Sequence, residues 1–185
     1  MLMGVKSLAP GFLIAMPQLG DPNFHRTVVL MIEHSDEGAM GLVLNRASPM
    51  TLRDLARGQK IKVATTRSGD QVYVGGPVEQ YRGFVLHDWE GVPERLQVMP
   101  GLFLSVTSDA LQGLLIAPDV RMRFCLGYSG WGPKQLEKEL AAGAWLFTEA
   151  QPDILLHGTP DGLWGDTLKG MGVDPAMLMT SGGIN

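Results

Sequence analysis

The chain has little cysteine, and this limits the ways in which its fold can be stabilised. It contains 185 residues and one cysteine, Cys125. A single cysteine cannot form a disulfide within the chain, and such a composition suits the reducing cytoplasm. A free cysteine in an apolar stretch is more often a small buried side chain than a reactive thiol. We therefore predict a cytoplasmic protein in which Cys125 packs in the core.

The chain also lacks a long apolar run. The segment MLMGVKSLAPGFLIAMP at residues 1–17 is interrupted by Pro10 and Gly11, and no small-residue cleavage site follows it. No other run approaches the roughly 20 apolar residues that a membrane-spanning helix needs. We predict neither a secretory signal nor an association with membranes.

Motifs for metal ions, nucleotides and cofactors are missing as well. The four histidines, which are His25, His34, His87 and His157, are far apart and show no metal-ligand spacing. Neither a P-loop nor a dinucleotide-binding glycine motif in a strand–helix setting occurs. The cluster EHSDEG at 33–38 could offer oxygen ligands, but the polarity of a hairpin turn explains it. We predict no metal and no cofactor.

Charge of either sign is modest and unevenly placed. Lys and Arg number 15 and Asp and Glu number 19, which gives a formal net charge of −4. An acidic chain can bind nucleic acid only through a local basic patch. The basic stretch at 46–67 could form one, with the candidates Arg53, Arg57, Lys60 and Lys62. No aromatic residue is interleaved with them for base stacking, so a solvated surface is the simpler interpretation.

Most of the secondary structure that the sequence predicts consists of short strands. Segments rich in Val, Ile and Leu, bounded by Gly or Pro, indicate strands. They lie at residues 12–16, 27–34, 41–45, 71–76, 83–88, 102–106, 121–129, 144–150 and 153–158. The turn-forming cluster between the second and third predicts a hairpin over 27–45.

Four helices are expected between these strands, at 51–58, 108–117, 133–143 and 159–172. Thr51, Ser108 and Thr159 stand at expected N-caps, and Pro133 stands in a first turn. The segments are short and show no repeat and no parallel rhythm. We therefore predict an α+β fold: a single domain, residues 1–185, with a mostly antiparallel, barrel-like β core and helices packed around it.

The stretch GYSGWGP at 127–133 raises the question of catalysis. It is similar to the G-x-S-x-G nucleophile elbow, but Trp131 stands where that motif needs its second glycine. The acid and base that could complete a triad, Asp153 and His157, follow Ser129 within one short run, which would place both on one side of a single strand. These residues argue against a serine hydrolase, and we predict no catalytic residue.

The same stretch offers backbone groups instead. Its glycines lead into the helix expected from Pro133, and free N–H groups at a helix start favour an anion. The glycine turn GGPV at 75–78 would also let a ligand approach, although tight-turn geometry alone explains both features. The candidate ligand-binding residues are Asp21, Asn23, Gly75, Gly76, Tyr128, Ser129, Gly130, Trp131 and Gly132.

Several longer strings occur together and in order. They are LIAMPQLGDPNF (13–24), VVLMIEHSDEGAMGLVLNR (28–46), VYVGGPV (72–78), RGFVLH (82–87), LGYSGWGPKQLEKEL (126–140), AWLF (144–147) and LWGDTLKGMGVDP (163–175). Together they resemble the AlgH/YqgE family of bacterial proteins, nearly end to end.

The resemblance implies a cytoplasmic α+β domain with a barrel-like core, in a family without an established biochemical activity. Members are often labelled transcriptional regulators, by association with alginate control in one lineage. The family accepts Ala or Ser at the position of Ser129, which implies that this serine is not a nucleophile. The family has no recognised DNA-binding module, and the helix expected at 51–58 leads into a basic loop rather than into a second amphipathic helix.

We therefore predict a regulatory protein that acts by binding rather than by catalysis. Its working surface would combine the LGDPNF, GGPV and GYSGWGP segments, provided that these lie close together. Two alternatives stay open. One is direct nucleic-acid binding through 46–67, which would depend steeply on salt. The other is an enzyme or sensor for a small anionic ligand at the glycine-rich loops, which would need a titratable group such as His25 or His87 nearby.

Overall fold

The computed structural model describes residues 6–153 and 159–180. Its strands are β1 (Gly11–Ala15), β2 (Val28–Ser35), β3 (Gly38–Val43), β4 (Ala47–Thr51), β5 (Gln71–Val74), β6 (Val78–His87), β7 (Leu96–Met99), β8 (Leu102–Ser105), β9 (Met122–Trp131) and β10 (Trp145–Thr148). Its helices are α1 (Leu52–Ala56), α2 (Ser108–Ile116), α3 (Gln135–Ala141), α5 (Pro160–Gly170) and α6 (Pro175–Thr180), with short 3-10 helices η1 (Pro22–Phe24) and η2 (Thr65–Arg67).

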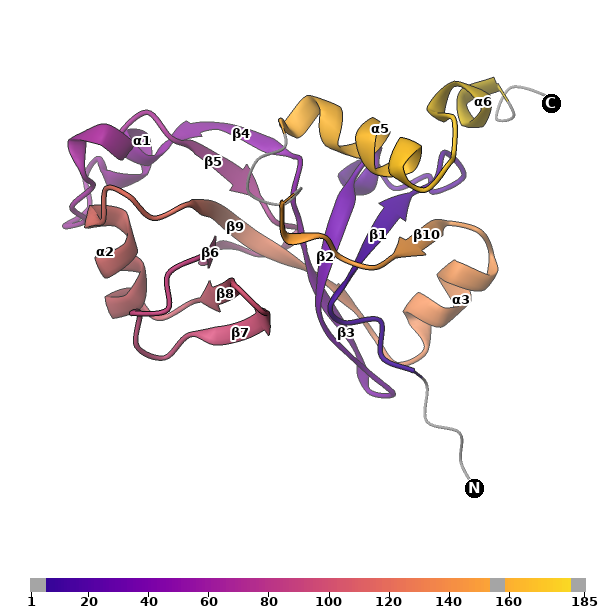
Figure 1. The fold of residues 1–185 in the computed structure, drawn as a ribbon, viewed down its shortest axis with the longest axis horizontal. Helices are drawn as coiled ribbons and strands as arrows, with labels where there is room; N and C mark the ends of the chain where they lie inside the picture. Colours follow the sequence, from indigo (N-terminus) through magenta and orange to yellow (C-terminus); the bar gives the residue numbers. More distant parts are fainter. Residues whose placement is uncertain (1–5, 154–158, 181–185) are drawn as a thin grey trace.

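The strands form one sheet with two halves, and β9 joins them (Figure 1). The order is β10-β1-β2-β3-β9-β6-β8-β7, with β5 added to β9 and β4 added to β5. The end of β9 pairs with β3 at Ala39–Gly41, and its earlier part pairs with β6. All pairs are antiparallel except that of β5 with β9.

A central core cluster ties the two halves together. It combines Phe12 and Leu30 of one half with Leu86 and Leu104 of the other, and α5 adds Trp164. Burying such side chains contributes about 1.5–3 kcal/mol each. Because successive strand residues point to opposite faces, each half also has an apolar outer face.

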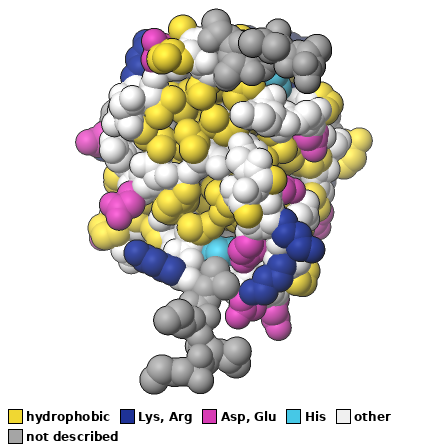
Figure 2. All heavy atoms as spheres, turned by 90° about the vertical axis from the view of Figure 1, so that its right-hand side faces the viewer, with side chains coloured by type: hydrophobic (Ala, Val, Ile, Leu, Met, Phe, Trp, Pro, Cys, Tyr) yellow, Lys and Arg dark blue, Asp and Glu magenta, His cyan; other side chains and the backbone are white. Residues whose placement is uncertain are grey.

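Helices cover these outer faces. The second cluster, beneath α3, contains Leu13, Val29, Trp131, Leu136 and Trp145. The third lies beneath α2 and contains Val72, Val85, Leu114 and Phe124. Figure 2 looks onto the end of the molecule on the right of Figure 1, where α3, α6 and β10 lie, and shows apolar side chains in the centre of this face with charged ones of both signs around them.

The predicted α+β class is confirmed, and so is the mostly antiparallel sheet. The sheet is not closed, so the description as a barrel applies only loosely. Strands β4 and β7 and helix α6 are additions to the prediction. The strand expected at 153–158 falls almost wholly outside the described residues. Thr107 rather than Ser108 is the N-cap of α2, because the Thr107 hydroxyl accepts the Ala110 N–H.

The predicted strand–helix boundary after Ser129 was wrong. Strand β9 continues through Trp131, since Ala39, Met40 and Gly41 of β3 pair with its last three residues. The helix expected at Pro133 begins only at Gln135, because Lys134 adopts a left-handed conformation with φ of 62°. The GYSGW residues are therefore the end of a paired strand.

Candidate functional site

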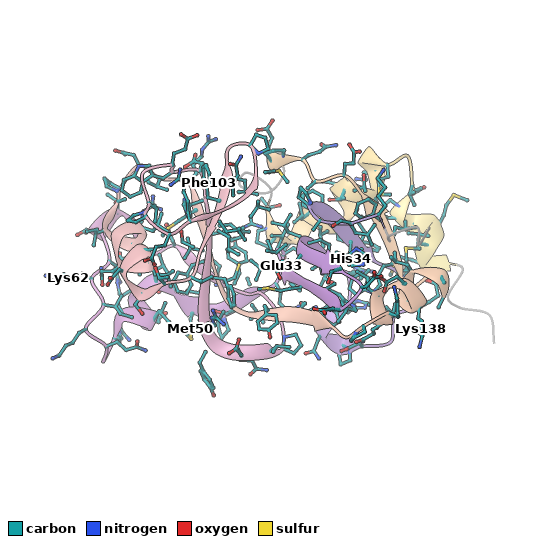
Figure 3. All side chains as sticks on the ribbon, turned by 90° about the horizontal axis from the view of Figure 1, so that it is seen from below. Glu33, His34, Met50, Lys62, Phe103 and Lys138 are labelled. Carbon is teal, nitrogen blue, oxygen red and sulfur yellow. The ribbon has the colours of Figure 1, made fainter. Side chains whose placement is uncertain are left out.

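A cleft of about 1110 Å³ lies between the two halves of the sheet. One wall is the β2–β3 hairpin, and the other is built from β6, β8 and the approach to β7. Ser7 and Ala9 border it from the N-terminal side. Figure 3 views the molecule from below and shows Glu33 near its middle, between the two halves. The cleft lies on the side of the sheet that carries the central core.

The floor of the cleft is apolar and aromatic. The ring of Tyr128 meets Phe84 edge-on, with centroids 5.8 Å apart. Tyr128 reaches this face because Gly127, with φ of 74°, interrupts the alternation of β9: Cys125 and Tyr128, three residues apart, both pack on the central cluster. Ile32, Met40, Leu104 and Val106 also belong to the apolar lining.

An irregularity in β2 decides which polar side chains face the cleft. The pairing of β2 with β3 shifts between Met31 and Glu33, so that Glu33 lies opposite Met40 and His34 opposite Ala39. Met40 belongs to the cleft side, and Ala39 packs on the cluster beneath α3. Glu33 consequently borders the cleft with its side chain, while His34, which also belongs to the lining, turns its ring to Glu137 of α3 (Figure 3).

The rim of the cleft is acidic. Four glutamates border it, which are Glu33, Glu37, Glu79 and Glu94, against one arginine, Arg82. Arg82 is paired with Glu79 at 3.1 Å and lies 5.3 Å above the Phe84 ring. Within residues 6–153 and 159–180, no ion pair involves the other three glutamates.

The predicted ligand residues of β9 divide between two faces. Tyr128 and Gly130 line the cleft, and Trp131 borders it. The Trp131 ring belongs to the second cluster, where it stacks on Phe24 with centroids 6.2 Å apart and donates its indole N–H to Glu139. It therefore acts mainly as a core side chain.

Ser129 is fully buried, and its hydroxyl donates to the carbonyl of Gly75 at 3.1 Å. Gly75 and Gly76 lie against the backbone of residues 127–129: a Cβ on Gly76 would come within 2.2 Å of the Tyr128 carbonyl. These glycines serve close strand packing, and they do not border the cleft.

The LGDPNF segment also lies away from the cleft lining. Its Asp21 carboxylate accepts the Asn23 N–H at 2.9 Å and caps η1. Phe24 connects the segment to the GYSGWGP strand through Trp131. The three segments expected to form one surface thus lie close to one another by packing, whereas Asp21 and Asn23 do not join Tyr128 at the cleft.

The start of α3 is occupied by the chain's own groups. The Gly132 N–H donates to Gln135 Oε1 at 3.0 Å. Glu137 lies in the first turn, where its backbone N–H, and then His34, hold the pKa of its carboxyl below the usual value. His34 Nε2 lies 3.0 Å from Glu137 Oε1, so the histidine that reaches this helix is His34.

The two histidines that the enzyme alternative would need near α3 lie elsewhere. His25 borders a second pocket of about 580 Å³ against α5, where Arg26 lies 5.5 Å above the Trp164 ring. His87 is buried, and its Nε2 lies 2.9 Å from Ser105 Oγ. His157 falls outside the described residues.

Buried groups that could act as nucleophiles are held in unreactive states. The Trp89 N–H donates to Nδ1 of His87, which leaves the proton of the neutral ring on Nε2, facing Ser105 as a donor. Burial lowers the pKa of His87 to about 4 and raises the pKa of the Cys125 thiol to about 12. Among the described residues, no three His, Cys, Asp or Glu side chains gather as a metal site.

The basic candidates lie at the α1 end of the molecule, where Figure 3 shows Lys62. Arg53 bonds Ser68, and Arg57 pairs with Asp54 at 3.8 Å. Lys60 and Lys62 are exposed. Two further basic residues of the stretch hold loop carbonyls: Arg46 those of Pro22 and His25, and Arg67 those near the end of α2.

Sequence reasoning missed the rim glutamates and Phe84. The EHSDEG cluster was a signal for Glu33 and Glu37, although it suggested metal ligands rather than a rim. No helix within the described part of the chain is long and apolar enough to cross a membrane.

Comparison with known proteins identifies the family of this fold. The AlgH-like family (DUF179) matches residues 12–176. The chain is 62% identical over 181 residues to a UPF0301 protein of Myxococcus xanthus, covering 98% of this chain and 100% of that one. It is 41% identical over 177 residues to a UPF0301 protein of Ruegeria pomeroyi, covering 92% and 95%. The chain belongs to the AlgH-like family, and the resemblance is confirmed.

Solved structures among the matches share this fold. The solution structure of the AlgH protein from Pseudomonas aeruginosa aligns with a TM-score of 0.78 at 35% identity, covering 94% of each chain. A crystal structure of a Corynebacterium diphtheriae protein aligns with a TM-score of 0.71 at 24% identity, covering 96% of this chain and 92% of that one. The second likeness concerns the fold alone.

Proposed function

We propose that this protein is a cytoplasmic regulator that acts by binding, and that the cleft between the two halves of its sheet receives a segment of a partner protein. The observation that carries the proposal is the aromatic and aliphatic floor around Tyr128 and Phe84. It is continued at the mouth by Leu96 of β7, which is 47% exposed. Phe84 itself is buried, so the exposed apolar surface here is that of Leu96, and exposed apolar surface of this kind marks interaction sites and ligand-binding grooves.

The chemistry of the buried groups supports binding over catalysis. Ser129 and Ser105 are each engaged in a buried hydrogen bond, and Cys125 is a neutral buried thiol. The side chains that line the cleft include no pair of nucleophile and base within hydrogen-bond reach among the described residues. Catalysis by a side chain needs such a pair or an activated group.

The edge strand at one end of the cleft favours a polypeptide as the partner. The cleft is about 1110 Å³ and ends at β7, an edge strand that pairs only with β8 within the described sheet. The sequence of β7, LQVM, carries no charge to block an added strand. A partner segment could therefore lie along the cleft beside this edge.

A matched pair of variants tests the proposal. Leu96 lines the cleft and Ile116 of α2 does not, while both are exposed, at 47% and 52%. A library of random 12-residue peptides displayed on mRNA is selected against the wild-type protein. We expect the recovered peptides to lose binding to Leu96→Arg and to keep it to Ile116→Arg. Peptides that bind both variants equally, or failure to recover any, would contradict the proposal.

The alternative of an enzyme or sensor for a small anionic ligand has weaker support. The N–H of Gly132 and the first turn of α3 are occupied by Gln135 and Glu137. Four glutamates against one arginine also disfavour an anion in the cleft. Direct nucleic-acid binding would instead use the α1 end, and neutralising Arg53, Arg57, Lys60 and Lys62 would abolish it and its salt dependence.

A further inference from the structure

We infer that the cleft selects a basic segment: apolar side chains of the partner rest on the Tyr128–Phe84 floor, and its Lys or Arg side chains reach the glutamates of the rim. This inference rests on the proposed function and adds the chemistry of the partner to it. Three features of the cleft support it: the placement of its acids, their lack of local counter-charges, and the way in which the chain's own arginine is held there.

The rim acids stand on both walls of the cleft. Glu33 and Glu37 belong to the β2–β3 hairpin, Glu79 begins the β6 wall, and Glu94 precedes β7. All four are exposed. A segment that enters between the walls is therefore flanked by carboxylates along its length. Complementary charge of this kind steers encounter and rejects partners of the wrong sign.

Three of these acids have no counter-charge in the described parts of the chain. Glu79 pairs with Arg82, but no ion pair forms at Glu33, Glu37 or Glu94. At the tip of the same hairpin, by contrast, Asp36 is paired with Lys134 of the loop before α3. The negative charge of the cleft thus remains available to a cation from outside.

Arg82 shows how the cleft holds a guanidinium. One of its nitrogens donates to Glu79 Oε2 at 3.1 Å, and the guanidinium carbon lies 5.3 Å from the centroid of Phe84. A carboxylate and an aromatic face together make a favourable site for a cation. A partner's cation that enters the cleft would meet the carboxylates of Glu33 and Glu94, which border it together with Tyr128.

The test compares peptide binding by variants with a neutralised rim glutamate and by a variant with a neutralised glutamate outside the cleft. Random 12-residue peptides displayed on mRNA are selected on the wild-type protein, sequenced, and remeasured by fluorescence anisotropy on Glu33→Gln, on Glu94→Gln and on the double variant. Glu149→Gln is the control, because Glu149 is exposed and does not border the cleft. Each variant removes one charge without changing the size of the side chain much, so folding is expected to be retained.

We expect peptides enriched in Lys or Arg beside apolar residues. Each rim neutralisation should weaken their binding about two- to fivefold, as for partly exposed ion pairs. The double variant should combine the two losses and depend less on salt, while Glu149→Gln should bind as the wild type does.

Two kinds of result would overturn the inference, and they have different consequences for the proposed function. Peptides that need Leu96 but carry no excess of Lys or Arg, or bind equally after both rim neutralisations, would refute the basic preference and leave the proposed function standing. Failure to recover any peptide that depends on Leu96 would refute the proposed function, and the inference with it.

Discussion

The hydroxyl of Ser129 donates a hydrogen bond to the carbonyl oxygen of Gly75 at 3.1 Å, and both residues are buried. This bond connects β9 to the residue that follows β5, at the point where the two halves of the sheet meet. Ser129 is therefore a structural residue, despite its place in a Gly-Tyr-Ser-Gly sequence.

Replacing this serine should affect stability alone. We expect Ser129→Ala to lower the free energy of unfolding by about 1 kcal/mol, the usual net contribution of such a bond. Urea unfolding followed by circular dichroism measures the change, and peptide binding at the cleft should be retained. A variant of unchanged stability that no longer binds would show that the hydroxyl has a direct role.

The sequence predicted local features of this region well and missed those that depend on distant partners. Strand propensity in RMRFCLGYS was sufficient to find β9, but its extension to Trp131 depends on pairing with Ala39–Gly41, about ninety residues earlier. The left-handed Lys134, which delays α3, has no sequence signal, because Lys rarely adopts that conformation.

The candidate site shows the same division. Tyr128 and Gly130 were named as ligand candidates because they lie in a glycine-rich segment, and both line the cleft. Glu33 could not be assigned to the cleft from the sequence, because the face of β2 on which its side chain lies is set by the shift in pairing between Met31 and Glu33. The opposite wall comes from residues 78–106, and Glu94 lies 61 residues after Glu33, so no local sequence pattern connects the two.

Gly76 should be intolerant of any side chain. A Cβ there would lie 2.2 Å from both C and O of Tyr128 and 2.4 Å from the Ser129 nitrogen. These are backbone atoms of a paired strand, so relief requires moving β9 itself. We expect Gly76→Ala to destabilise the protein by more than about 3 kcal/mol or to prevent folding.

Gly130 provides the matched control for this experiment. A Cβ at this position would meet Tyr128 Cε2 at 3.5 Å and Val78 Cγ2 at 3.9 Å, which is ordinary contact. We expect Gly130→Ala to change stability by no more than about 0.5 kcal/mol. Equal thermal unfolding temperatures for Gly76→Ala and Gly130→Ala would show that Gly76 does not lie as close to the backbone of β9 as described.

Cys125 should be unreactive in the folded protein. Its side chain is fully buried in the central cluster, and burial raises the pKa of the thiol to about 12. Since the thiolate is the reactive species, Ellman's reagent at pH 8 should label the native protein only as it opens. Labelling should become rapid and reach one equivalent in guanidinium chloride, because the chain has one cysteine. Fast labelling of the native protein would place the thiol at the surface.

His87 should make stability depend on pH below neutrality. Burial lowers its pKa from 6.5 to about 4, so the unfolded chain binds a proton more readily than the folded one. Stability therefore rises with pH across this window: the contribution is fully present above pH 6.5 and is lost as pH falls towards 4. The loss should be on the order of 2–3 kcal/mol.

The measurement is the difference in the free energy of unfolding between pH 7 and pH 4.5, from urea titrations. Carboxylates also titrate here, so the wild type is compared with His87→Gln, which should show the smaller loss because it lacks this proton linkage. His25→Gln removes an exposed histidine instead and should follow the wild type. If His87→Gln lost as much stability as the wild type, the His87 ring would already be accessible to water and protons in the folded protein. Its Nε2–H would then not be a buried donor to Ser105, as described above.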